Sequence, residues 1–533
     1  MRLVSLVPLI LLGVVRAQGL PPLPVPRENP MTAEKAVLGK ILFWDEQLSS
    51  DDTVACGTCH RPRAGGADPR VGRHPGYDGV LFTADDTFAS PGISYLDQVR
   101  EYAPQGVFGF ESQVTSRAAS SAFVSQYWPS QFWDGRAYRQ FVDPETHLVS
   151  IEHHGSLEWQ AVKPIMDPAE MGHAGRTWSE VVQKLTNAVP LALATNLPPD
   201  VQAALTRDPT YPALFQRAFG SPTVTAEHIA FAIATYERTL VPDQTPYDLW
   251  IAGQSNAMTP NQIAGFQAFQ TQRCDACHVP PHFTDFTFRA LGLRPWYEDP
   301  GRMDVTADRA DRGKFKVPNL RNIGQRSTFM HNGALSGWTQ LFDFYDHLIP
   351  TFPGNQDPLY SATSVPPSVR PALQDFLENA LTDPRFANEL PPYDRPTLRS
   401  ELPGNQGYGY GTSGGGGYTP RLIARQPAFV GAVDFRIGLR DAAGAAPAML
   451  LLSNAQRLYP GLGVVVNVDL GAAIGLNAVS AGSGAGEGYA TWQLPLPADP
   501  NLSGVTLYVQ AFVIDPAAPI GLSSSAGVQV PVL

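Results

Sequence analysis

The sequence predicts a mainly α-helical protein built from two tandem modules and followed by a C-terminal all-β, sandwich-like domain. First, the chain has 533 residues, which is too long for one compact core and favours two or three domains. Second, the pattern C-x-x-C-H occurs twice, at residues 56–60 and 274–278, each time after an apolar segment with helical periodicity. Third, the composition changes near residue 390, where Pro- and Gly-rich sequence gives way to strand-like alternation.

The bulk composition narrows the class of protein. Hydrophobic residues make up 43% and charged residues 16%, as in a folded globular protein somewhat poor in charge. The 38 Lys and Arg residues are outnumbered by 49 Asp and Glu, giving a formal charge of -11. This balance argues against a surface for nucleic acid or for anionic membranes, because both need clustered positive charge.

The N-terminus has the features of a secretory signal. Arg2 precedes an apolar run over residues 3–15, and small residues lead to a predicted cleavage after Ala17. The run is short for a membrane span, and no later stretch approaches the roughly 20 apolar residues that a span needs. We therefore expect residues 1–17 to be a signal peptide and the mature protein to be periplasmic or otherwise exported. An uncleaved anchor is the alternative.

All four cysteines lie in the two C-x-x-C-H units, and three explanations compete for them. Disulfides do not require a His after each pair, and zinc modules usually separate their cysteine pairs by about 15–20 residues, far less than here. Covalent c-type haem attachment alone uses every residue of both units, because two thiols bind the porphyrin and the adjacent His ligates iron. We expect two covalently bound haem c groups, attached at Cys56, Cys59, Cys274 and Cys277, with His60 and His278 as iron ligands.

The segments before the two motifs predict helices that pack beside a porphyrin. Val37, Leu38, Ile41 and Leu42 share one helical face, as do Ile263, Phe266 and Phe269. The sequence thus predicts two tandem c-type haem (cytochrome c-like) modules. We place them at residues 18–250 and 251–395.

Several stretches in a fixed order carry a family resemblance. They are LGKILFWDEQLSSDDTVACGTCH, QFWDGRA, DPAEMG, CDACH and GKFKVPNLRNIGQRSTFMHNGALSGWTQLFDFY, spanning roughly residues 32 to 350. On these stretches the chain resembles the bacterial di-haem cytochrome c peroxidase and MauG family. The resemblance implies a mostly α-helical fold with one haem per half. The N-terminal module would be peroxidatic and the C-terminal module would transfer electrons.

The resemblance assigns roles to three further residues. Trp133 matches a Trp between the two haems, where an oxidisable indole would relay an electron hole; the alternative is a buried structural Trp. Glu170 matches an acidic residue over the peroxide-binding face and would shuttle a proton between the peroxide oxygens. Gln160, ten residues earlier, would border the same pocket. Without the resemblance, Asp167 would read as a helix N-cap with Pro168 at N1.

The sixth ligand of the second haem has two candidates. Relatives place Met or Tyr fourteen residues after the His of an [FM]H[DN]G stretch, and counting from His331 reaches Tyr345. Met330 is the less favoured alternative. Tyr345 could instead be a core aromatic residue that shares a helical face with Leu341 and Phe342.

Two other features depart from the family. His74 matches a removable ligand of the first haem only approximately, inside an insertion at about residues 61–115, and is at least as well explained as a loop residue. The Asn that helps hold an inter-haem calcium is replaced by Ala118, which makes calcium doubtful even though the carbonyl groups of Arg326 and Thr328 remain. Asp78, Asp85 and Asp86 offer an acidic loop, but such loops are more often solvated.

The C-terminal region predicts a domain without chemistry of its own. Residues 396–424 are rich in Gly and Pro and are expected to be a linker. In residues 425–533 the stretches VDFRIGLRD, GVVVNVDLG, ATWQLPLPAD and VTLYVQAFVID alternate apolar and polar positions, as strands of a β-sandwich do. This domain has no Cys and no His, so we expect a structural, docking or surface-retention role.

These observations lead to one expected function and two alternatives. We expect an exported di-haem peroxidase that reduces hydrogen peroxide with electrons from a small redox protein, a cytochrome c or a cupredoxin, or from another donor. One alternative is a MauG-type oxidase or oxygenase acting on a protein or organic substrate. The other is a di-haem electron carrier, which needs no open coordination position. The sequence leaves the oligomeric state open.

Overall fold

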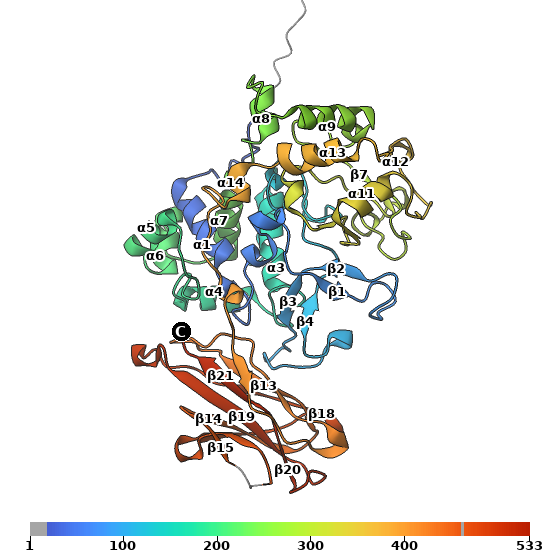
Figure 1. Cartoon of the computed structure of the whole chain (residues 1–533). Helices are drawn as coiled ribbons and strands as arrows, with labels where there is room; N and C mark the ends of the chain where they lie inside the picture. Colours follow the sequence, from blue (N-terminus) through green and yellow to red (C-terminus); the bar gives the residue numbers. More distant parts are fainter. Residues whose placement is uncertain (1–18, 460–462) are drawn as a thin grey trace, which may run out of the picture.

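The computed structural model describes residues 19–459 and 463–533 (Figure 1). The signal predicted for residues 1–17 lies outside the described residues. Across the described ranges, no helix has both the length and the apolar character needed to cross a membrane.

The helix before the first cysteine motif forms as predicted. Helix α1 (Ala33–Trp44) begins at Thr32, whose hydroxyl accepts the Lys35 N–H, and its apolar face is fully buried against α7 (Ala226–Thr239). The two helices cross closely at Gly39, where a Cβ would overlap the carbonyl oxygen of Ala232. Helix α1 then leads through the short turn η1 (Glu46–Leu48) into α2 (Cys56–Cys59), which carries the first cysteine pair.

The helix before the second motif also packs closely on a partner helix at a glycine. Helix α9 (Pro260–Thr271) begins at Thr259 with a capping box and packs on α13 (Arg370–Asp375). A Cβ on Gly265 would overlap the carbonyl oxygen of Ala372. Helix α9 runs into η5 (Cys274–Ala276), which carries the second cysteine pair. In both halves, therefore, a glycine lets the motif-bearing helix approach a partner helix closely.

The remaining helices surround these two pairs. In the N-terminal half they are α3 (Ser156–Met166), α4 (Trp178–Asn187), α5 (Pro199–Arg207) and α6 (Tyr211–Phe219). In the C-terminal half they are α8 (Pro246–Ile251), α10 (Met303–Thr306), α11 (Gly337–Tyr345), α12 (Pro358–Ser361) and α14 (Pro384–Ala387).

The helical part also contains small antiparallel sheets that the sequence did not predict. The pairs are β1 (Gly72–His74) with β2 (Thr87–Ala89), β3 (Pro91–Ser94) with β4 (Ser112–Val114), β5 (Phe141–Val142) with β6 (Val149–Ile151), β7 (Phe288–Arg289) with β8 (Phe315–Lys316), and β9 (Thr328–Phe329) with β10 (Leu335–Ser336). Their strands are too short to show alternation, and β1 to β4 occupy the insertion at residues 61–115.

The C-terminal region forms two antiparallel sheets that share one core, as the predicted sandwich requires. The larger sheet has the order β11-β21-β19-β14-β17 with β20 on β19, and the smaller has the order β12-β13-β18. The strands are β11 (Gln406–Tyr408), β12 (Arg421–Ile423), β13 (Arg436–Ala443), β14 (Pro447–Ser453), β17 (Ile474–Val479), β18 (Ala485–Gln493), β19 (Thr506–Ile514), β20 (Leu522–Ser524) and β21 (Gly527–Pro531), with β15 (Gln456–Tyr459) and β16 (Val466–Val468) pairing beside them. Ile437, Leu450, Trp492 and Ala511 are buried in the core.

Residues 406–423 of the segment at 396–424, expected to be a linker, are instead part of the β domain, while Leu398 before them is buried in the core of the N-terminal half. Strand β11 pairs with β21, and β12 pairs with β13. A Cβ on Gly527 would overlap the ring of Tyr408, which lies opposite it across the strand pair. Inside the segment, a Cβ on Gly411 would overlap the carbonyl oxygen of Ser524, so this glycine serves close packing onto the domain. Composition alone therefore predicted a linker where the structure forms paired strands.

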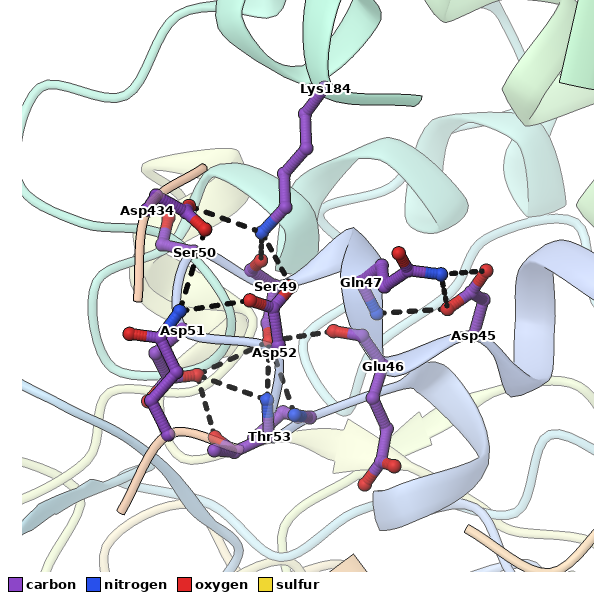
Figure 2. Close-up of polar contacts among 12 residues, drawn as sticks. Asp45, Glu46, Gln47, Ser49, Ser50, Asp51, Asp52, Thr53, Lys184 and Asp434 are labelled. Atoms are coloured by element: carbon purple, nitrogen blue, oxygen red, sulfur yellow. Dashed lines mark hydrogen bonds and ion pairs between the residues drawn. The ribbon is translucent and has the colours of Figure 1, made fainter. Parts of the chain in front are cut away.

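The β domain is docked onto the N-terminal half through a buried polar cluster (Figure 2). Lys184 on α4 lies 2.7 Å from Asp52 Oδ1 and 3.6 Å from Asp434 Oδ2 of the β domain. The Gln426 amide donates to Asp52 Oδ2 at 2.9 Å, and the Arg436 guanidinium donates to the Ser50 carbonyl at 3.4 Å. The two parts therefore form one packed unit, with the loop before Cys56 at their junction.

Candidate haem sites and active site

The histidines of both motifs are oriented in the same way. His60 Nδ1 lies 3.1 Å from the Gly66 carbonyl oxygen, and His278 Nδ1 lies 3.1 Å from both the Phe283 and the Pro318 carbonyl oxygens. A carbonyl oxygen only accepts, so Nδ1 must carry the hydrogen in both rings. This leaves the lone pair of Nε2 free to bind a metal, which is the usual arrangement of a ligating histidine.

The four cysteines fit thioether attachment better than the other two explanations. Within the described residues none of the four cysteines forms a disulfide, and each pair lies on a single turn, α2 or η5. Burial raises the pKa of Cys56 and of Cys274 to about 12, so both thiols are neutral at physiological pH. Among the described residues, no three His, Cys, Asp or Glu side chains converge as a metal-binding group, which argues against a four-cysteine zinc site.

A cavity of about 380 Å³ lies against the second motif. Cys274, Cys277 and His278 form one side of it, and the side chains of Trp133, Met330 and Tyr345 border it. Leu341 and Phe342 border it too, so the shared face of α11 predicted for Leu341, Phe342 and Tyr345 is a cavity face. The residues present therefore fit a haem held at the second motif.

Both candidates for the sixth ligand border this cavity. Tyr345 lies on the last turn of α11, and burial raises the pKa of its hydroxyl well above the usual value. Met330 has a positive φ of 71°, a conformation that is uncommon for a side chain of this kind. The neighbouring His331 stacks on Phe315 at 3.6 Å between ring centroids. The geometry is compatible with either residue as a ligand.

Trp133 is fixed between the two halves. Its indole N–H donates to the Ala118 carbonyl at 2.8 Å, and its own carbonyl accepts from the Lys316 N–H at 2.8 Å. The side chain is 8% exposed and borders the cavity at the second motif. It is therefore held rigidly where the N-terminal segment meets the second haem pocket, while its role as an electron relay stays a prediction.

Glu170 lies in a turn beside the first motif. The N–H groups of Glu170, Met171 and Gly172 all donate to the Asp167 carbonyl, so no helix begins at Pro168 and the N-cap reading is wrong. Burial, together with the charge of Asp167, raises the pKa of Glu170 to about 7. Its charge acts in turn on the thiols of Cys56 and Cys59. A carboxyl group with this pKa can both give and take a proton near neutral pH.

Gln160 and the Glu170 turn are joined through one helix. Gln160 is half-buried on α3, whose C-terminal end leads directly into the turn. Strand β3 supports the turn from another side, because the Ile93 N–H donates to the Glu170 carbonyl at 3.1 Å.

His74 lies in strand β1, where the insertion forms a hairpin with β2. Its Nδ1 accepts the Gly76 N–H at 3.2 Å, so in the neutral ring the hydrogen is on Nε2. With the hydrogen on Nε2, that nitrogen has no lone pair for iron, which favours His74 as a structural residue of the hairpin over His74 as a haem ligand. The acidic loop beside it is also explained locally, since Asp85 accepts two backbone N–H groups and Asp86 pairs with Arg73 at 2.6 Å.

The side chain of Arg326 bonds one of the carbonyl groups that were considered for calcium, whose binding the sequence makes doubtful. Arg326 Nε donates to the Thr328 carbonyl at 3.3 Å, and Nη2 donates to the Ala119 carbonyl at 3.1 Å. These contacts occupy carbonyl oxygens that a cation in this region would use. Sequence reasoning considered only the backbone of Arg326 and missed its side chain, because the direction of a side chain in an irregular loop has no pattern to read.

Lys316 is a second buried cation that sequence reasoning missed. The side chain is 5% exposed, lies with Nζ 4.9 Å from the centre of the Trp128 ring and borders the cavity. Burial lowers the pKa of Lys316 to about 8. Lys316 lies in the stretch GKFKVPNLRN, and nothing in this sequence pattern indicates that its side chain is buried.

Several known proteins are similar in sequence to this chain. A family model described as di-haem cytochrome c peroxidase matches residues 33–256. The methylamine utilization protein MauG of Methylorubrum extorquens is 30% identical over 325 residues, covering 60% of this chain and 71% of that protein. Cytochrome c551 peroxidase of Nitrosomonas europaea is 28% identical over 324 residues, which cover 60% of this chain and 75% of that protein.

Two further comparisons concern length and fold. Cytochrome c peroxidase Ccp of Escherichia coli is 29% identical over 317 residues, but the matched region spans only about half of it, 52%, and 58% of this chain. The crystal structure of a MauG-like protein associated with microbial copper homeostasis matches with a TM-score of 0.50 at 21% identity, covering 70% of this chain and 96% of that one. The fold, the two C-x-x-C-H sites and these relatives together show that the chain belongs to the di-haem cytochrome c peroxidase and MauG family of oxidoreductases.

Proposed function

We propose that the protein is an exported di-haem c-type peroxidase that reduces hydrogen peroxide with electrons from a small redox protein. The observation that carries this proposal is Glu170, a carboxyl group with a pKa raised to about 7 beside the first haem motif. An electron carrier has no use for a proton-exchanging carboxyl group at this position. A peroxidase needs one, because both oxygens of peroxide must leave as water.

Each module would hold one covalently attached haem c. Cys56 and Cys59 would attach the first haem and Cys274 and Cys277 the second, with Nε2 of His60 and of His278 on the two irons. When bound, the haems supply the redox chemistry by accepting electrons one at a time and delivering two to the peroxide bond. We place the two modules at residues 18–250 and 251–395.

Glu170 would move the proton that the reaction requires. Heterolytic cleavage of the O–O bond proceeds when a proton leaves the inner oxygen and reaches the outer one. The ionised carboxylate takes the first proton, and the resulting acid returns it to the leaving oxygen. Gln160, on the helix that leads into this turn, would border the same pocket.

Trp133 would join the two haems electronically. Hydrogen bonds hold Trp133 both at its indole N–H and at its backbone carbonyl, so the residue needs no rearrangement during electron transfer. Hydrogen peroxide and a small donor protein, a cytochrome c or a cupredoxin, would be the partners. Export would follow from the N-terminal signal.

One observation favours a MauG-type oxidase as a second candidate. Tyr345, the residue predicted as the sixth ligand, borders the cavity at the second motif. An anionic oxygen donor stabilises oxidised iron more strongly than a thioether does, which suits an enzyme that stores oxidising equivalents on both haems. The substrate would then be a protein or organic molecule in place of a donor cytochrome.

Steady-state peroxide reduction by the haem-loaded protein tests the proposal. We expect peroxide consumption coupled to oxidation of a reduced small cytochrome c or cupredoxin, assayed with and without prior reduction of the enzyme. Mass spectrometry should find two haem additions on one chain. Entirely low-spin ferric spectra, together with no peroxide turnover under either condition, would support the electron carrier instead.

A further inference from the structure

Arg326 is a partly buried cation whose guanidinium donates to carbonyl groups and, among the residues that the structure describes, has no carboxylate partner, in contrast to Arg321 and Arg238. Arg321 pairs with Asp248 at 2.7 Å, and Arg238 pairs with Glu158 at 2.7 Å. Within the described ranges, no Asp or Glu lies within ion-pair distance of Arg326, and its guanidinium donates only to the carbonyl groups of Ala119 and Thr328. Carbonyl oxygens from separate segments, converging on one positive charge, resemble the surroundings of a bound metal cation.

The guanidinium lies at the junction of the two haem pockets. Its stem packs against Gly65, just after the first motif, where a Cβ would overlap the Cγ of Arg326. The same side chain borders the cavity that contains His278. Its charge also acts on the imidazole of His60. Arg326 therefore lies between the loop after the first motif and the cavity at the second motif.

Arg326 and Trp133 bond neighbouring carbonyl groups of the same loop. The Trp133 indole donates to the carbonyl of Ala118, and Arg326 donates to the next carbonyl along the chain, that of Ala119. The position of this loop thus depends on both side chains. Burial lowers the pKa of Arg326 to about 10, so the group still carries its positive charge at neutral pH.

We propose that Arg326 is a built-in cation that takes the place of a metal ion at the junction of the two haem pockets. It ties the loop at residues 118–119 to the turn at residues 326–328, which positions Trp133. Its fixed charge favours the reduced form of the neighbouring haems, because reduction adds an electron close to a positive group. The inference rests on the proposed pair of haems, but not on peroxide as the substrate.

Spectroelectrochemical titration of the haem-loaded protein tests this role. We expect Arg326→Gln to lower the reduced-to-oxidised ratio of at least one haem about tenfold at a fixed applied potential, a shift of about 59 mV for a one-electron couple. Arg326→Lys should retain most of the wild-type potential, because it keeps the charge. Arg294→Gln is the matched control, since Arg294 borders the same cavity but is already paired with Glu298 at 2.7 Å; its shift should be clearly smaller.

A chelator completes the design. Prolonged treatment of the wild-type protein with EGTA should leave both midpoint potentials unchanged, because the cation is part of the chain. A shift in either potential on EGTA treatment would overturn the replacement of a metal by Arg326. So would unchanged potentials in an Arg326→Gln protein that keeps both haems. If Arg326→Gln does not fold, the Arg326→Lys variant is measured in its place. A midpoint potential close to that of the wild type supports the proposal, and a potential lowered by about 59 mV or more contradicts it. Potentials are measured without peroxide, so failure of the peroxidase proposal leaves this test intact.

Discussion

At the scale of single residues, Glu170 is proposed to act in catalysis, and its burial also makes its ionised form unfavourable for stability. We expect Glu170→Gln to keep both haems and to slow the reaction with peroxide by roughly 100- to 10,000-fold, the usual contribution of general acid–base catalysis. Stopped-flow mixing of ferric protein with peroxide measures the rate constant directly. In the wild type this rate should rise as the pH passes through about 7, where the carboxylate forms, and the variant should lose that rise. An unchanged rate constant would exclude Glu170 from the mechanism.

The same substitution should stabilise the protein above neutral pH. Burial raises the pKa of Glu170 from 4.5 to about 7, so the native state favours the protonated form. Any stability that this preference contributes is complete below pH 4.5 and is lost as the pH rises through 7. Glutamine stays neutral, so Glu170→Gln should unfold at a higher temperature than the wild type at pH 8 and at nearly the same temperature at pH 5. A variant less stable at pH 8 would contradict this reasoning.

The sixth ligand of the second haem is also a question of single residues. If Tyr345 is the ligand, Tyr345→Phe should change the low-spin spectrum of this haem and raise its reduction potential, because an anionic donor to ferric iron is lost. Met330→Leu is the matched control, since both side chains border the cavity. A changed spectrum in Met330→Leu and an intact one in Tyr345→Phe would assign the Met instead.

At the scale of elements, the two motif-bearing helices depend on one glycine each. Gly39→Ala and Gly265→Ala should each destabilise the fold by about 1–3 kcal/mol, because the added methyl group meets a partner helix backbone. This loss exceeds the gain of about 1 kcal/mol that Ala brings to a helix interior. Gln267→Ala, at an exposed position of α9, is the control and should change the stability by less than about 0.5 kcal/mol. Chemical denaturation of the haem-loaded proteins measures all three.

The elements that sequence analysis predicted are the helices that precede the cysteine motifs and the alternating strands of the C-terminal region, whereas α4 and α6 were not predicted although their apolar residues gather more clearly on one face. Helices α1 and α9 were found because their apolar residues repeat at helical spacing, and β13, β16, β18 and β19 because theirs alternate. The two-residue strands of the helical part show no period at all. The glycines of residues 396–424 predicted a linker, although Gly411 lies where a Cβ would overlap the carbonyl oxygen of Ser524 and so serves packing. The contacts of Arg326 depend on tertiary structure, which a single sequence does not display.

At the scale of the whole molecule, the cluster around Lys184 joins the β domain to the N-terminal half (Figure 2). Lys184→Met should cost about 3–5 kcal/mol, because it leaves the fully buried Asp52 without its nearest cation. The pKa of Asp52 is already raised to about 6 by burial, so the loss should grow as the pH rises above that value and ionises the carboxyl group. The double variant Asp52→Asn/Lys184→Met should recover most of the loss. Thermal unfolding at pH 5 and pH 8 provides the comparison, and additive effects of the two substitutions would show that the pair is not coupled.

The docked β domain has a consequence for the order in which the protein is assembled. Gln426 and Arg436 contact the loop at residues 50–52, a few positions before Cys56, and both side chains are fully buried. These residues are synthesised long after the first motif. If the first haem is attached at Cys56 and Cys59 as proposed, we expect its attachment to precede docking of the β domain on this loop, because the complete chain is needed for docking. Docking of the β domain would then be a late step of maturation.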